Sequence, residues 1–162
     1  MRLELIHPMI VHFPIALLFT GTVLRLIAFY LSKRASFSFV LPASWTILLL
    51  GVISAWAAVF AGEIAADIVG PTLENTKILS EHALHALITA TGFTLSLILD
   101  WVRALLFTKL HKRSWFIKKG LGIAVGLFYF FSLINLVITG EYGATLVYEE
   151  GAAVKKQIIE TL

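Results

Sequence analysis

Long apolar runs separated by short polar stretches dominate this sequence. Four of these runs cover roughly 9–31, 43–66, 83–107 and 117–139, and each is long enough to cross a bilayer core, which takes about 20 apolar residues per helix. They fill most of the 162 residues, so no room is left for a separate soluble domain. The pattern predicts an all-α, polytopic membrane protein in which residues 1–162 form a single bundle of four transmembrane helices.

Proline, serine and glycine set the predicted helix ends. Because proline denies the carbonyl four residues earlier its hydrogen-bond donor, the first helix either starts near Pro14 or is kinked there. Ser80 is the expected N-cap of the third helix. The apolar run 144–148 follows Gly140 and is flanked by further glycines. We therefore expect a short extracytoplasmic C-terminal loop or tail that folds back, rather than a fifth span.

The composition supports a membrane protein and narrows its chemistry. Hydrophobic residues make up 59% of the chain and the mean hydropathy is +0.89, whereas the apolar share of a soluble domain is nearer one half. Cysteine is absent, which excludes disulfides, thiolate metal sites and iron–sulfur clusters. Any ligand must therefore be bound by imidazole, carboxylate or backbone groups.

The distribution of charge predicts the orientation. Eight basic residues lie in or beside the two connections that join the first run to the second and the third to the fourth, whereas the opposite face has only four, together with nine of the ten acidic residues. The eight are Lys33, Arg34, Arg103, Lys109, Lys112, Arg113, Lys118 and Lys119. Cytoplasmic loops carry the excess of lysine and arginine, so both termini should be extracytoplasmic. The pI of about 9.3 is thus explained by basic loops that face the cytoplasm beside the lipid bilayer. It gives no reason to expect a nucleic-acid partner.

Four of the five histidines gather at the extracytoplasmic end. His7 and His12 precede or begin the first helix, and His82 and His85 begin the third. Residues three apart on a helix are separated by about 60°, so His82 and His85 can both face the bundle interior. Residues expected to surround the histidines, as neighbours rather than ligands, are Glu63, Asn135 and Pro14.

This set of histidines points to a cofactor site. A single histidine at a helix end is commonly an interfacial residue, but ionisable groups inside a membrane are rare and usually mark function. Two imidazoles from different helices can ligate one haem in a four-helix bundle. We therefore expect His12 and either His85 or His82 to bind one haem b, and electron transfer to a periplasmic or membrane redox partner.

Other classes stay open. His12, His82 and His85, with His7 or Glu63, could hold zinc, copper or iron in a metal-binding or metal-transport protein. The chain could also be a structural subunit of a larger membrane redox complex, or form a homo-oligomer. An enzyme is the least supported class, because the sequence has no nucleophile–base arrangement, phosphate loop or paired catalytic carboxylates. Two further expectations are that Arg25 and Asp100 pair or snorkel, and that His111 is solvated in a basic loop.

Two motifs resemble a known family. The opening His7-Pro-Met-Ile-Val-His12-Phe-Pro-Ile-Ala-Leu-Leu18 is similar to the H-P-x-x-V-H-F-P-I-A-L-L opening of the bacterial membrane family called domain of unknown function 2231. The segment Gly143-Ala-Thr-Leu-Val-Tyr148-Glu-Glu-Gly151 resembles its closing G-x-x-L-V-Y-x-x-G. The resemblance covers the whole chain. It implies a four-helix fold in the bacterial inner membrane with outside termini, and we expect some members of the family to bind haem.

Overall fold

The computed structural model describes residues 2–31, 37–109 and 115–154 and is helical throughout these ranges apart from short turns. A 3₁₀ turn, Leu3–Leu5, leads into the short helix α1 (Ile6–Ile10). The long helices are α2 (His12–Leu31), α3 (Val40–Val69), α4 (Lys77–Lys109) and α5 (Trp115–Tyr148), and a second 3₁₀ turn, Gly70–Thr72, follows α3. Four helical segments are long and apolar enough to cross a membrane, and the first of them runs through α1 and α2. The predicted all-α, four-helix fold is therefore confirmed.

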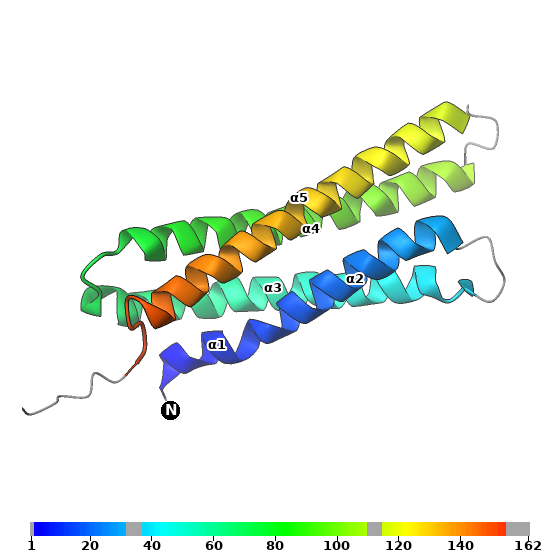
Figure 1. Cartoon of the computed structure of the whole chain (residues 1–162). Coiled ribbons are helices and arrows are strands. Elements are labelled where there is room, and N and C mark those ends of the chain that lie inside the picture. The colour runs from blue at the N-terminus through cyan, green and yellow to red at the C-terminus, as the bar shows by residue number, and fades with distance from the viewer. Residues whose placement is uncertain (1, 32–36, 110–114, 155–162) are drawn as a thin grey trace, which may run out of the picture.

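The bundle consists of two hairpins. α2 packs mainly on α3, and α4 packs mainly on α5, so that two pairs of antiparallel helices lie side by side (Figure 1). We call the end where α1 begins, α3 ends and α4 begins the histidine end. The opposite end, where α2 and α4 finish, is the basic end. His111 lies outside the described residues, as do Lys33, Arg34, Lys112 and Arg113.

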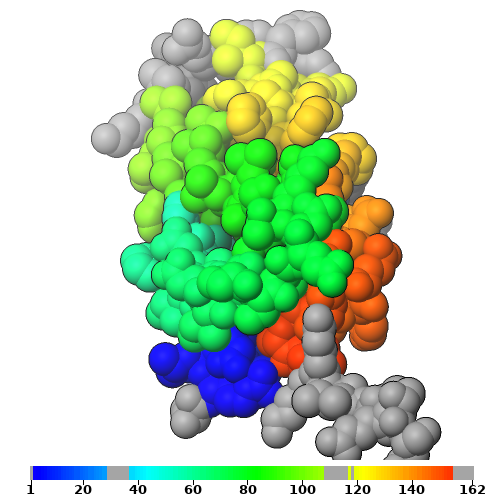
Figure 2. All heavy atoms as spheres, turned by 90° about the vertical axis from the view of Figure 1, so that its left-hand side faces the viewer, coloured from blue at the N-terminus to red at the C-terminus, as the bar shows by residue number. Residues whose placement is uncertain are grey.

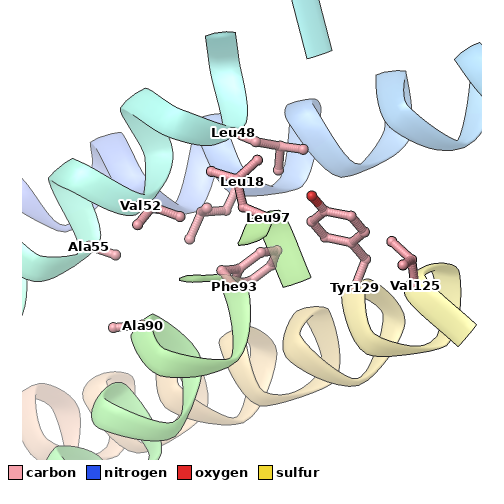
Figure 3. Close-up of a cluster of buried hydrophobic side chains, with 9 residues drawn as sticks. All are labelled: Leu18, Leu48, Val52, Ala55, Ala90, Phe93, Leu97, Val125 and Tyr129. Carbon is pink, nitrogen blue, oxygen red and sulfur yellow. The ribbon is translucent and has the colours of Figure 1, made fainter. Parts of the chain in front are cut away.

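Many large apolar side chains lie on the outer surface of the bundle, and several small residues of α3 lie inside it. Phe13, Phe60 and Phe131 are each more than 60% exposed, whereas Ala55, Ala58 and Ala61 of α3 are buried. Helices in lipid associate through small residues that let their backbones approach. All four long helices contribute to one buried cluster in the middle of the bundle (Figure 3): Leu18, Leu48, Val52, Ala55, Ala90, Phe93, Leu97, Val125 and Tyr129.

A close approach of α2 and α3 is built from two glycines and two leucines. A Cβ atom on Gly51 would lie 2.7 Å from the side chain of Leu18, and one on Gly21 would lie 2.8 Å from that of Leu48. Leu18 of α2 therefore packs against Gly51 of α3, and Leu48 of α3 packs against Gly21 of α2. These two contacts hold α2 and α3 close together.

The helices are longer than the apolar runs. The predicted loop at 144–148 is wrong, because α5 continues through this run to Tyr148 and buries Leu146. Ser80 as N-cap is also wrong, since α4 starts at Lys77, whose backbone N–H donates to the side-chain oxygen of Asn75 at 2.9 Å. Glycine lowers helix propensity without forbidding a helix, and helix ends can extend past the hydrocarbon into polar sequence. The sequence pattern therefore made these two helices too short, with α4 starting too late and α5 ending too early.

Pro14 marks a break rather than the start of the first helix. α1 ends at Ile10, Val11 is a turn, and α2 begins at His12 with Pro14 buried in its first turn. The backbone N–H of Val11 still bonds to the His7 carbonyl at 3.1 Å. The proline ring thus interrupts the ladder while the chain continues in nearly the same direction.

Candidate functional site

The histidine end brings α1, the end of α3, the beginning of α4 and the end of α5 together. Figure 2 looks onto this end, where the blue N-terminal segment lies beside the orange-red end of α5. The guanidinium group of Arg2 contributes to this contact, because its Nη2 donates to the Ala153 carbonyl at 3.0 Å. The imidazoles of His7, His82 and His85 are partly buried here.

His7 is held by α3. Its Nδ1 lies 2.9 Å from the backbone oxygen of Ala58. The ring lies over Gly62, where a Cβ atom would come within 3.1 Å of it. Gly62 therefore makes room for the imidazole, and α1 is docked onto α3 through this side chain.

His82 is held by α5 in the same way. Its Nδ1 lies 3.0 Å from the backbone oxygen of Thr139, and a Cβ atom on Gly143 would lie 3.2 Å from the ring. The rings of His7 and His82 contact each other, with centroids 5.9 Å apart and planes at 87°. Two helices that are remote in the sequence thus bring two imidazoles together.

His85 forms a third arrangement on the next turn of α4. Its Nδ1 lies 3.2 Å from Oδ1 of Asn135, and its ring stacks on Tyr142 at 5.3 Å and 21°. The amide nitrogen of Asn135 donates to the Phe131 carbonyl at 3.2 Å, which directs the amide oxygen toward His85. Asn135, expected beside the histidines, does hydrogen-bond to one of them.

These hydrogen bonds assign the tautomers. A carbonyl oxygen can only accept, so Nδ1 carries the proton in His7, His82 and His85 when the rings are neutral. Nε2 then has its lone pair available in all three rings. This is the arrangement seen in metal-bound histidines, whose second ring nitrogen donates to a carbonyl or carboxylate.

The structure places the other expected site residues apart from this group. His12 is exposed in the first turn of α2 and makes no hydrogen bond or ring contact among the described residues. Glu63 is also exposed. Pro14 is buried in the first turn of α2, close to the break at Val11 that separates α2 from α1, which carries His7. His7 therefore occupies the place beside His82 that the sequence interpretation gave to His12.

No three histidine, aspartate or glutamate side chains come close enough to hold a metal ion within residues 2–31, 37–109 and 115–154. The sequence interpretation also missed Gly62 and Gly143 as the residues that accommodate the rings, and Tyr142 as the stacking partner of His85. The sequence shows that Tyr142 and Gly143 are adjacent, but it does not show that they lie opposite α4.

Comparison with known proteins gives one match. The family model described as "Predicted membrane protein (DUF2231)" matches residues 4–156. No curated protein and no solved structure matches the chain.

Proposed function

Because the chain belongs to the DUF2231 family of predicted membrane proteins, a description that specifies no activity, we propose a function from the geometry of the histidine end. We propose that the protein is a membrane cytochrome that binds one haem b through His7 and His82. It transfers electrons at the extracytoplasmic face of the bacterial inner membrane. Its redox partner is a periplasmic or membrane protein.

The observation that carries this proposal is the tautomer of the two rings. Nδ1 of His7 and Nδ1 of His82 both donate to backbone carbonyls of other helices, at 2.9 and 3.0 Å, which leaves both Nε2 atoms free to ligate iron. A hydrogen bond donated by the ring nitrogen that does not bind the metal orients the imidazole and makes the other nitrogen a more basic ligand. The two rings are neighbours, with centroids 5.9 Å apart.

The donor set favours haem over a simple metal ion. Structural zinc is almost always held by four protein ligands and catalytic zinc by three, whereas no group of three suitable side chains is found in the described part of the chain. Haem needs fewer protein ligands than a bare metal ion, and His7 and His82 would hold it. When bound, the haem would supply one-electron redox chemistry. That chemistry favours electron transfer as the function.

The protein contributes orientation and shielding. Gly62 and Gly143 leave space for the rings, and the Ala58 and Thr139 carbonyls fix their rotation. His85 is the neighbouring base, positioned by Asn135 and Tyr142 but outside the His7–His82 pair.

The test is the absorbance of the purified protein and of matched histidine variants. The wild type should show a Soret band and sharp α and β bands on reduction. His7→Ala and His82→Ala should each lose most of the bound haem, and His82→Gly should regain it with added imidazole. His12→Ala, with its exposed ring, is the control and should retain wild-type haem content.

Two outcomes would support the alternative functions. Bound zinc, copper or iron without a Soret band, lost in His82→Ala, would indicate a metal-binding protein. A purified protein with neither a Soret band nor a bound metal would indicate a structural subunit of a larger redox complex. Haem that is lost in His12→Ala but retained in His7→Ala would contradict the assignment of the ligands.

A further inference from the structure

A groove on the outer surface of the bundle lies between α4 and α5. Its volume is about 400 Å³, which is within the range of about 300–1,000 Å³ found for small-molecule sites. The residues that line it include Ile88 and Gly92 of α4 and Ala124, Phe128, Phe131 and Asn135 of α5. From Ala124 to Asn135 the axis of α5 rises by about 16 Å. The groove is therefore long enough for an extended apolar chain.

The end of the groove nearest the histidine end is polar. Asn135 lines this end, and its Oδ1 accepts from Nδ1 of His85 at 3.2 Å. The amide nitrogen of Asn135 donates to the Phe131 carbonyl at 3.2 Å. An amide group has two hydrogens on its nitrogen and two lone pairs on its oxygen, so one donor and one acceptor of Asn135 remain available for a ligand in the groove.

His85 continues the same wall of the groove. His85, Ile88 and Gly92 follow one another at spacings of three and four residues, so they share one face of α4. Nε2 of His85 has no hydrogen-bond partner within the described ranges, where the only buried side-chain polar atom without a partner is the Tyr129 hydroxyl. Nε2 is therefore accessible, and with the proton on Nδ1 it can only accept. A hydroxyl group is the complementary ligand group for this end of the groove.

The charges near this end favour a neutral ligand. The basic residues that the structure describes at the histidine end are Arg2 and Lys77. The guanidinium group of Arg2 bonds to Glu4 and to the Ala153 carbonyl. Lys77 lies more than two turns of α4 before His85, or about 12 Å along the axis. An anionic lipid headgroup would therefore have no neighbouring cation among the described residues.

We propose that this groove binds a lipid-soluble quinol, with its apolar tail along α5 and a ring hydroxyl hydrogen-bonded to Asn135 and His85. Phe128 and Phe131, which line the groove and are 47% and 68% exposed, offer aromatic surfaces against which a flat ring can pack. The choice of a quinol among neutral hydroxylated lipids rests on the proposed electron-transfer function, because quinols are the lipid-soluble class of electron carrier.

The experiment measures the Tm of the full-length protein in detergent as decylubiquinol is added, with dithionite present to keep the probe reduced. A ligand that binds only the folded state raises the Tm with its concentration, so the wild-type Tm should rise. Decylbenzene has a ring and the same tail but no hydroxyl, and it should need about ten-fold more for the same rise, as expected for loss of a hydrogen bond. Asn135→Leu keeps the side-chain size and should weaken decylubiquinol binding by a similar factor.

A matched pair of variants tests the apolar part of the groove. Ala124→Phe places a large side chain in the groove and should abolish the rise. Ile123→Phe adds an aromatic ring at the neighbouring position, which is 54% exposed and is not part of the groove lining. It should respond like the wild type. This pair decides the question if Asn135→Leu fails to fold.

The haem content of each sample separates this proposal from the proposed function. A haem-free protein that responds to decylubiquinol would support the groove site and contradict the haem assignment. A haem-containing protein that does not respond would overturn the groove site alone. The groove site is also overturned if Asn135→Leu and Ala124→Phe both respond like the wild type, or if decylbenzene is as effective as decylubiquinol. An equal response to dioctanoylglycerol, which has a hydroxyl but no ring, would overturn the choice of a quinol.

Discussion

At the scale of single residues, the histidine end depends on the absence of side chains as much as on their presence. Gly62 lies under the ring of His7, and Gly143 lies under that of His82. Both glycines are within helices, where they need no unusual backbone conformation. Each is therefore required by the close approach of an imidazole, because any Cβ atom would press on the ring.

This close approach predicts the effect of Gly143→Ala. The added methyl group would lie 3.2 Å from Cε1 of His82, so the ring must shift by tenths of an ångström. Metal–imidazole bonds tolerate little displacement, and haem content per folded protein should fall. Gly140→Ala is the matched control, since a Cβ atom there meets nothing within 4 Å. It should keep its haem and gain up to about 1 kcal/mol of helix stability. Equal haem loss in both variants, measured by absorbance and thermal unfolding, would indicate that the effect is not local.

At the scale of helices, the position of His7 depends on a helix that is too short to be stable alone. α1 has five residues, whereas isolated helices shorter than about 12–15 residues are marginal in water. Its orientation is fixed by the break at Val11, by the His7–Ala58 hydrogen bond and by the contact of Arg2 with Ala153. Pro14 maintains the break, because its nitrogen cannot donate to the Ile10 carbonyl.

Pro14→Ala should therefore rotate His7 relative to α4. Alanine restores the missing donor and favours one continuous helix through α1 and α2, which turns the ring away from Ala58. We expect weaker haem retention in a protein that still inserts and folds, since the apolar content barely changes. Haem content after detergent dialysis, compared with the wild type, is the measurement. Undiminished retention in a variant whose structure shows a straightened helix would mean that the proline only limits helix length.

At the scale of the whole molecule, the two ends of the bundle have opposite electrostatic character. The described acidic residues other than Asp100 lie toward the histidine end, and lysines and arginines follow the last turns of α2 and α4. Between the ends, the ion pair of Arg25 and Asp100 joins one hairpin to the other. Removing one partner of such a buried pair typically costs about 3–5 kcal/mol.

This asymmetry predicts the topology. The basic end should face the cytoplasm, so reporter fusions after Arg34 and after Lys112 should show cytoplasmic activity. A fusion in the connection between α3 and α4, at Asn75, should show the opposite activity and is the internal control. A periplasmic signal from either basic connection would reverse the orientation and place the histidine end inside the cell.

The sequence by itself determined the features that depend on local composition. The number of spans and their centres follow from runs of apolar residues, since the transfer of each run into lipid depends only on its own side chains. The presence of histidines at one end, and the similar depth of Arg25 and Asp100, follow from position along those runs. The depth of a residue in the membrane depends only on its position along a helix, so the order of residues is sufficient to predict it.

Only the tertiary structure decided which histidines meet. His7 and His12 are both near the start of the first helix, and the opening motif does not distinguish them. The break at Val11 and the packing of α1 on α3 turn His7 toward His82 and leave His12 exposed. The extension of α5 to Tyr148 likewise brings Tyr142 and Gly143 opposite α4. Rotation about a helix axis is set by contacts between segments remote in the chain, and those contacts are not encoded in the pattern of any one helix.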